Sequence, residues 1–282
     1  MAASQISSDR RGWTFYFLGA VFVAYVVFLY GPMLCIYILS FQGPQGGLTF
    51  PMRGVSLHWF RQLIDQGDTG DLMGALSRSI PLAVVVMALT VLISLAGGLA
   101  FRRRFPGSGV LFYLVIASLV APGYVLSIGI GLMFQLLGFD TNWYTSALGA
   151  QLSWTLPFGL LIMFAIFGRF SPSYEEASRD LGANQMQTMW LVVVPILLPG
   201  MIAVALFGFT LSYDEFARTL QTTGSTNTMP IEIWSMTQNV TSPSIYALGT
   251  LTTALSFLVI GVSLGAIALI QRHRQGSVVG RG

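Results

Sequence analysis

Hydrophobic positions along the chain are gathered into long runs without a charged side chain, and short polar stretches separate these runs. A helix needs about 20 residues to cross about 30 Å of hydrocarbon, and every run exceeds that length. Because a charge at the centre of a bilayer costs about 2.5–3.5 kcal/mol, such runs are typical of membrane-spanning segments. Trimmed at turn-forming residues, they predict six spanning helices, near residues 13–40, 78–101, 109–136, 146–168, 191–213 and 246–271.

Composition supports a membrane protein. The 282 residues are 54% hydrophobic and 9% charged, whereas a soluble domain carries about 25% charged residues. Arg10 and Arg11 precede the first run, as they would in a signal peptide, but its apolar stretch of about 28 residues is longer than a signal peptide needs and no Ala-x-Ala site follows. The predicted fold class is therefore all-α, a polytopic membrane protein with six transmembrane helices.

The distribution of arginine predicts the orientation, because cytoplasmic segments of membrane proteins are enriched in basic residues. With both termini in the cytoplasm, four of the 14 basic residues lie outside, namely Arg53, Arg61, Arg78 and Arg218. The other ten lie inside: Arg10, Arg11, Arg102, Arg103, Arg104, Arg169, Arg179, Arg272, Arg274 and Arg281. Seven acids fall outside and four inside, so the outer segments are net negative.

Several predicted spans contain helix breakers. They are Pro32, Pro122 with Gly123, and Pro157. In a bilayer such breaks are tolerated where a neighbouring helix or a cavity satisfies the freed backbone groups, and transporters use broken helices at binding sites. A packing kink explains the same residues, so both interpretations stay open. The outer segment 214–245 contains "MPIEIWSMTQNV", which predicts a further helix on the outer surface.

A short polar stretch, "SPSYEEASRDLGANQ" at residues 171–185, is predicted to face the cytoplasm. Ser173 and Glu176 match the S-x-x-E capping box, and Gly182 is placed to end a helix. These signals predict a helix of eight residues over 174–181, about 12 Å long. Pro195 and Pro199 then fall near the start of the next predicted span, where a missing N–H costs little.

The same stretch resembles a family signature. Glu176-Ala177-Ser178, three residues, Gly182, nine residues and then "VVVP" at 192–195 are similar to the EAA motif of membrane subunits of binding-protein-dependent ABC importers. That motif reads E-A-A, three residues, G, nine residues, I-x-L-P. Here Ser178 replaces the second Ala, and Val replaces both Ile and Leu. Residues 41–60, 209–224 and 229–250 resemble the spermidine/putrescine permease branch of this family.

The resemblance implies a domain organisation and partners. A type-1 transmembrane domain is expected at 72–270, after an N-terminal helix and a long extracytoplasmic loop at 1–71 and before a cytoplasmic tail at 271–282. The helix at the EAA motif would be a coupling helix that contacts an ATP-binding subunit through Glu176, Ala177, Ser178 and Gly182. Expected partners are two ATP-binding subunits, a homologous second permease and an extracytoplasmic solute-binding protein, all at a bacterial inner (plasma) membrane.

No enzymatic site is predicted. A Walker A loop requires a lysine at the nucleotide phosphates, and the chain contains none. His58 and His273 are isolated in polar stretches, so no metal site or catalytic triad is expected. The chain is predicted to carry no cofactor, to bind no nucleic acid, and to depend on a partner ATPase that binds ATP and Mg²⁺.

A tentative substrate pathway consists of two acids and three aromatic residues. Asp214 and Glu215 follow the fifth predicted span, where the family has an acidic patch, and Tyr213, Tyr124 and Trp154 offer rings on which an ammonium group packs. The negative outer segments favour a cationic, polyamine-like solute. Outer acids also follow from the orientation alone, and aromatic residues also belong to membrane interfaces or cores.

Other functions are alternatives to a polyamine permease. Within the same class, the solute could be an opine, an amino-acid derivative, sulfate or ferric ion. A stand-alone channel or secondary carrier would also have six helices, but secondary carriers usually place ionisable residues within their spans. An intramembrane enzyme would need a catalytic constellation that the sequence does not contain.

Overall fold

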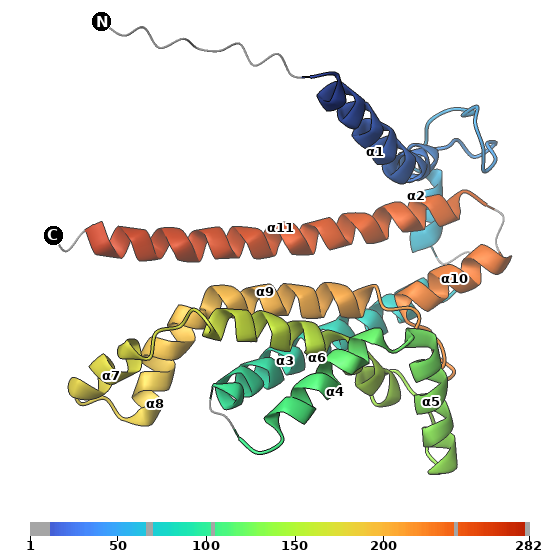
Figure 1. The fold of residues 1–282 in the computed structure, drawn as a ribbon. Helices are drawn as coiled ribbons and strands as arrows, with labels where there is room; N and C mark the ends of the chain where they lie inside the picture. Colours follow the sequence, from blue (N-terminus) through green and yellow to red (C-terminus); the bar gives the residue numbers. More distant parts are fainter. Residues whose placement is uncertain (1–11, 66–69, 103–104, 240–241, 280–282) are drawn as a thin grey trace, which may run out of the picture. The chain divides into compact units, whose positions relative to one another are not determined.

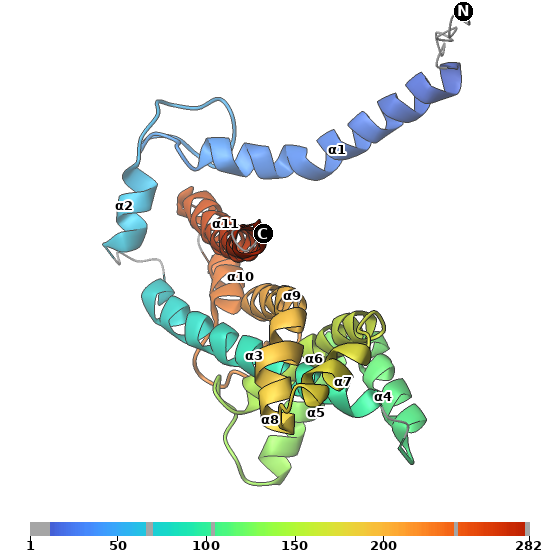
Figure 2. The ribbon, with the colours of Figure 1, turned by 90° about the vertical axis from the view of Figure 1, so that its left-hand side faces the viewer.

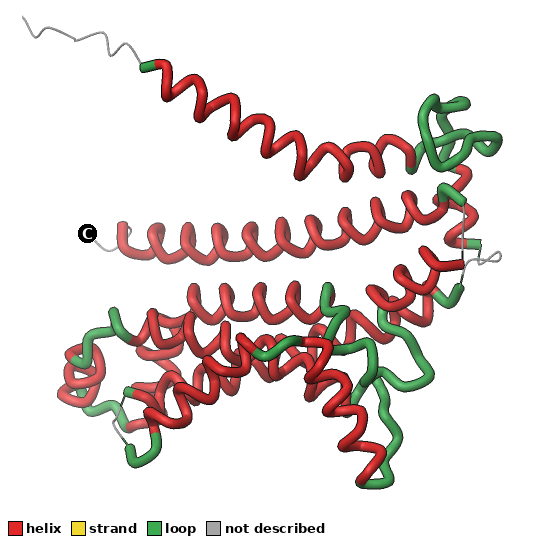
Figure 3. Tube along the Cα trace, turned by 45° about the vertical axis from the view of Figure 1, so that its right-hand side comes forward, coloured by secondary structure: helices red, strands yellow, loops and turns green. Residues whose placement is uncertain are grey.

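The structure is a computed structural model that describes residues 12–65, 70–102, 105–239 and 242–279. The described residues form helices and loops, and their one β-bridge is the isolated pair Gln42 and Val55 (Figure 3). The helices of Figure 1 are, in chain order, α1 (Trp13–Leu39), α2 (His58–Ile64), α3 (Leu72–Phe101), α4 (Ser108–Val120), α5 (Gly123–Leu136), α6 (Ser146–Phe167), α7 (Ser173–Asp180), α8 (Gln185–Thr188), the π-helix η1 (Met189–Val193), α9 (Val194–Tyr213), α10 (Met229–Asn239) and α11 (Ser244–Val279).

Five of the six predicted spans are confirmed as helices long and apolar enough to cross a membrane. They are α1, α3, α6, the continuous segment Gln185–Tyr213, and Ser244–Val262 of α11. The helix predicted from "MPIEIWSMTQNV" is confirmed as α10. Of the arginines that predict the orientation, Arg10, Arg11, Arg103, Arg104 and Arg281 lie outside the described residues.

The third predicted span, residues 109–136, is not one straight helix. It consists of α4 and α5, which are bent by 107° at a break between Val120 and Gly123. Helices of 13 and 14 residues measure about 20 Å each, so neither alone crosses about 30 Å of hydrocarbon. The physical cause is Pro122, which has no N–H to continue the helix and stands in an extended conformation at ψ 123°.

The chain divides into two compact units, of which the larger comprises residues 68–239 and 253–282. Its centre is formed by α3, α6 and α9, and small side chains bring the three helices close together. Thr90 and Thr155 share a hydrogen bond of 2.8 Å between α3 and α6. Close packing of small and hydroxyl-bearing residues is the usual mode of helix association in lipid.

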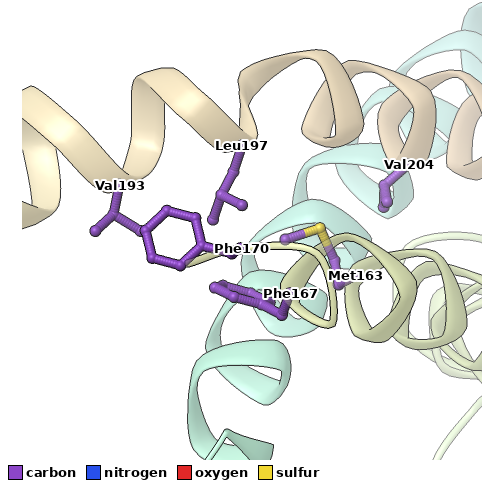
Figure 4. Packing of buried hydrophobic residues seen from close by; sticks show 6 residues of the cluster. All are labelled: Met163, Phe167, Phe170, Val193, Leu197 and Val204. Carbon is purple, nitrogen blue, oxygen red and sulfur yellow. The ribbon is translucent and has the colours of Figure 1, made fainter. Parts of the chain in front are cut away.

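A hydrophobic cluster lies at the end of this bundle that carries α7 and α8. Met163 and Phe167 come from α6 and Phe170 follows it, while Val193, Leu197 and Val204 come from η1 and α9 (Figure 4). The side chains of Val193 and Leu197 point toward the rings of Phe170 and Phe167. The cluster therefore anchors the polar stretch 171–185 to a rigid base.

Polar caps at the other end explain why α3 begins six residues before its predicted start. The Gly74 N–H donates to the Asp71 carboxylate at 3.0 Å, and Arg78 pairs with the same carboxylate at 3.0 Å. The Arg78 guanidinium also holds the pKa of the Asp71 carboxyl below its usual value. The charge-free run set the predicted start of this span near Arg78. Arg78 instead lies well inside α3, and its side chain reaches back to the N-cap residue Asp71.

The fifth span begins at Gln185, not at 191 as predicted, so Pro195 and Pro199 lie inside a continuous helical segment. The π-helix η1 ends two residues before Pro195. A proline ring clashes with the carbonyl four residues earlier, and a widened turn at that place relieves the clash. Pro195 is the second residue of α9, near the helix start as expected, whereas Pro199 lies inside the helix.

The smaller unit comprises residues 1–67 and 240–252. Its loop after α1 is organised by the buried Gln42, whose side-chain oxygen accepts the Arg53 N–H at 2.7 Å. The Tyr246 hydroxyl, at the start of α11, donates to the Leu48 carbonyl at 2.8 Å. The bond from Tyr246 to Leu48 joins the two segments of this unit.

Candidate functional site

The polar stretch forms the predicted short helix. It is α7, Ser173–Asp180, one residue earlier than expected. Gly182 has φ +84°, the Gly182 N–H donates to the Arg179 carbonyl at 2.8 Å, and the Ala183 N–H donates to the Ser178 carbonyl at 3.1 Å. This pair of bonds is the Schellman motif, which ends the helix sharply and requires a left-handed residue. The predicted role of Gly182 as helix terminator is confirmed.

The predicted capping box at Ser173 and Glu176 is wrong. Ser173 lies inside the helix, the N-cap is Pro172, and the side chain that accepts a backbone N–H at this end is that of Ser171, from Ser173 at 3.3 Å. The capping box belongs instead to α8, where Asn184 accepts from the Gln187 N–H and the Gln187 side chain accepts from the Asn184 N–H. Glu176 therefore has no capping role and its side chain is free to face outward.

The four residues of the predicted ATPase contact divide between two sides of α7. Glu176, Ala177 and Gly182 are exposed. Ser178 is buried, and its hydroxyl bonds the Thr188 hydroxyl of α8 at 2.8 Å. The small Ser178 thus lets α7 pack against α8, and it is the residue of this set that faces inward.

Apolar side chains surround the exposed motif residues. Leu181 is 90% exposed, and further large side chains nearby are exposed as well, namely Tyr174, Met186, Trp190 and Leu191. Figures 1 and 2 show α7 and α8 together at one end of the α3–α6–α9 bundle. An exposed apolar group on a polar helical hairpin is typical of a protein-binding surface.

One acid of α7 points inward. The Glu175 carboxylate pairs at 2.5 Å with the guanidinium of Arg102, which is the C-cap residue of α3. The same guanidinium lies 5.0 Å from the ring centre of Phe170 and 5.6 Å from that of Phe167. Arg102 was predicted only as one of several cytoplasmic charges, and no signal in the sequence links it to Glu175, 73 positions away.

The tentative substrate residues at the end of α9 have different surroundings. Tyr213 is buried, and its ring stacks on Phe209 at 6.0 Å. Asp214 is exposed. The Glu215 carboxylate accepts the Arg218 N–H at 2.7 Å, and partial burial raises the pKa of this carboxyl while that bond opposes the rise. Of the two acids, Asp214 is the more exposed, although partial burial raises the pKa of its carboxyl as well.

Arg218 was predicted as an ordinary outer charge, but it is 2% exposed and holds the broken helix pair together. Its guanidinium donates to the carbonyls of Ser118 and Ala121 at 3.2 and 3.4 Å. In an unbroken helix the Ser118 carbonyl would accept the N–H of residue 122, which is proline. Arg218 therefore satisfies a carbonyl that the break leaves without a helical donor.

The Arg218 guanidinium also packs against Trp154, one of the aromatic residues predicted to line the substrate pathway. It lies 4.6 Å from the ring centre of Trp154 and donates to the Ser153 hydroxyl at 2.8 Å. Tyr124, the second residue of α5, is 48% exposed, and its neighbour Gly123 lies beside the Arg218 side chain. The structure thus gathers Glu215, Trp154 and the start of α5 around Arg218.

Within the described part of the chain, no three His, Cys, Asp or Glu side chains form a group able to hold a metal ion.

Comparisons with known proteins place these features in context. The model of a family described as "Binding-protein-dependent transport system inner membrane component" matches residues 71–275. The spermidine/putrescine transport system permease protein PotC of Escherichia coli (strain K12) is 27% identical over 244 residues, which cover 86% of this chain and 90% of PotC. The putrescine transport system permease protein PotI of the same strain is 26% identical over 232 residues, 79% of this chain and 81% of PotI.

Solved structures share the fold. A bacterial ABC transporter involved in the import of the acidic polysaccharide alginate aligns with a TM-score of 0.66 at 16% identity, covering 95% of this chain and 99% of that chain. The MetNI methionine ABC transporter, in an inward-facing conformation, aligns with a TM-score of 0.55 at 16% identity, covering 71% and 95%. At this identity the similarity concerns the fold.

Proposed function

The chain belongs to the family of inner membrane components of binding-protein-dependent transport systems, and from that premise we propose that α7 couples it to a separate ATPase and that its solute is a polyamine-like cation. The chain is a multi-pass permease subunit of an ABC importer. Its finer properties, namely the ATPase contact, the solute and the composition of the complex, are the subject of the proposal.

The observation that carries the ATPase contact is the exposure of the motif residues on a rigidly held helix. Glu176 and Ala177 face outward on α7, and the Schellman motif at Gly182 turns the chain back toward the bundle. The apolar side chains of Leu181 and Met186 extend this surface. An ATP-binding subunit with a groove for a short helix would bury them.

Transport would then follow from alternating access. Closure of two ATP-binding subunits on ATP and Mg²⁺, which those subunits bind, would draw together the coupling helices of this chain and of a homologous second permease. Helices that pack as a rigid bundle turn as a body, so the path between the two permeases would open first to one side and then to the other. An extracytoplasmic solute-binding protein would deliver the solute.

A polyamine-like solute is supported by the names of two relatives and by one side chain. PotC and PotI are named for spermidine/putrescine and putrescine transport. The exposed Asp214 offers a carboxylate that attracts an ammonium group. The exposed ring of Tyr124 at the start of α5 adds a surface of the kind that binds organic cations.

The ATPase contact is tested by Glu176→Lys in the complete complex. The reversed charge on the exposed face is expected to abolish uptake and to weaken co-purification of the ATPase, while membrane insertion is unchanged. Asp180→Lys is the matched control, because Asp180 is an exposed acid of the same helix at a position that the motif does not specify. Co-purification of the ATPase at wild-type yield with Glu176→Lys would contradict the proposal.

A further inference from the structure

The contact between Arg102 and Glu175 joins two elements that the chain itself does not connect directly. Among the described residues, α7 follows α6 through residues 168–172 and leads into α8, η1 and α9. Any displacement of α7 therefore reaches α6 and α9 through the backbone. The third helix of the bundle, α3, ends at Phe101 and has no such connection to α7.

The ion pair supplies the missing connection. The Arg102 and Glu175 side chains are 23% and 18% exposed, and their carboxylate–guanidinium distance is 2.5 Å. Cation–π contacts with Phe167 and Phe170 help to hold the guanidinium in place. Because Arg102 is the C-cap of α3, force on its side chain acts on the end of that helix.

Little else lies between α7 and α3. A cavity of about 660 Å³ is bounded by Leu99, Arg102, Phe167 and Glu175, among others. A second cavity, of about 300 Å³, is also bounded by Leu99, Arg102 and Glu175, together with residues of α8 and η1. The ion pair is thus a direct link between α7 and the end of α3, whose other contacts, through Leu95 and Leu99, are with the hydrophobic cluster of α6, η1 and α9.

We propose that Arg102 is a positioning residue for transport, which transmits the displacement of α7 to α3 through Glu175. This inference rests on the proposed role of α7 as the ATPase contact. The pair faces the interior of the subunit, away from Glu176 and Ala177, so it acts on transmission within the permease and leaves ATPase docking intact. Without it, the displacement of α7 reaches α3 only indirectly, through the packing of α3 against α6 and α9, so coupling is less efficient.

The test measures spermidine uptake per ATP hydrolysed in proteoliposomes that contain the complete complex. Arg102→Gln and Glu175→Gln are each expected to lower this ratio by about two- to thirtyfold, the range in which residues that carry coupling act. The double variant is expected to fall no further than either single variant, since both remove the same link. Arg102→Lys keeps the charge and is expected to retain most of the ratio.

Arg179→Gln is the matched control. Arg179 approaches the same carboxylate at 3.9 Å but belongs to α7 itself, so its loss leaves the link to α3 in place and the ratio unchanged. If Arg102→Gln fails to fold, Glu175→Gln carries the test, because it alters α7 without altering the end of α3.

Two results would overturn the inference. One is a wild-type ratio in both Arg102→Gln and Glu175→Gln; the other is loss of the ATPase from these variants on purification, which would assign the pair to docking. Failure of the wild-type chain to retain an ATPase would instead contradict the proposed function. The two failures are therefore distinguishable in one set of preparations.

Discussion

At the scale of single residues, Asp214 and Glu215 show how neighbours of the same chemistry acquire different roles. The Glu215 carboxylate is engaged by the backbone of its own turn, through the Arg218 N–H. Asp214 is exposed, and its carboxylate forms no hydrogen bond or ion pair within the described residues. A solute that reaches this segment would meet Asp214 first.

Asp214→Asn is therefore expected to raise the KM for spermidine by about two- to fivefold, because an exposed ion pair contributes about 0.4–1 kcal/mol. The maximal rate should change little, since the amide keeps the shape of the side chain. Uptake of radiolabelled spermidine into proteoliposomes measures both.

Asp140→Asn is the control for this prediction. It removes one negative charge from another exposed outer position, so it reports the general effect of the outer charge. An equal rise in KM for the two variants, or no rise for Asp214→Asn, would remove Asp214 from the solute path.

The sequence could predict the residues of the site only in part. Local capping signals in the polar stretch predicted the position of α7 to within one residue and the turn at Gly182, although the capping box among them is not formed. The inward direction of Ser178 depends on Thr188 in the next helix, and the role of Arg218 depends on carbonyls about 100 positions away. Contacts between residues of different helices cannot be predicted from the pattern of polar and apolar residues.

At the scale of helices, the contact of α6 with α3 depends on one glycine. A Cβ atom at Gly159 would overlap the Ser94 hydroxyl oxygen and would lie 2.8 Å from the methyl group of Thr90. The Thr90 side chain has little freedom to move, because it is β-branched and hydrogen-bonded to Thr155. Only glycine allows this approach of the two backbones.

Gly159→Ala is expected to lower the melting temperature of the purified permease by about 2–6 °C, because overpacking a helix contact costs about 1–3 kcal/mol. Thermal unfolding followed by tryptophan fluorescence or by size-exclusion chromatography measures the shift. Adding Ser94→Ala should recover part of it, since the hydroxyl is the closest obstacle.

The same substitution at Gly149 is the matched control. Gly149 lies on α6 as well, and a Cβ there meets no atom within 4 Å. Alanine favours a helix by about 1 kcal/mol over glycine, so Gly149→Ala should be neutral or stabilising. A melting temperature for Gly159→Ala at or above that of the wild type would show that the contact tolerates a methyl group.

Prediction of the helices succeeded where the charge-free run is long, and it failed where contacts with other parts of the chain determine whether a helix continues. Charge-free runs indicated all six regions, and Pro32, Pro81 and Pro157 lie within continuous helices. Pro122 alone among these prolines interrupts a predicted span. The difference lies in the following Gly123 and in Arg218, which satisfies the carbonyls at the break from another part of the chain.

At the scale of the whole molecule, the directions of α3 and α6 determine how many times the chain crosses the membrane. Their first halves meet in the cluster of Leu82, Val86 and Ala147, and their ends meet where Phe101 lies 4.9 Å from Phe164. The two helices therefore run the same way. The chain between them must return to the opposite face, so the bent pair α4–α5 accounts for one crossing and the six crossings are preserved.

This topology makes opposite predictions for two exposed positions, Asp140 after α5 and Leu181 after α7. Replacing Cys35, the one cysteine of the chain, by alanine gives a background for single-cysteine variants. In spheroplasts without the ATPase, a membrane-impermeant maleimide is expected to label Asp140→Cys directly and Leu181→Cys only after permeabilisation. If α4 and α5 entered and left on the same side, α6 would start in the cytoplasm and the pattern would be reversed. Reversed labelling would thus place α7 beyond the reach of any cytoplasmic ATPase and contradict the coupling that the rest of the proposal requires.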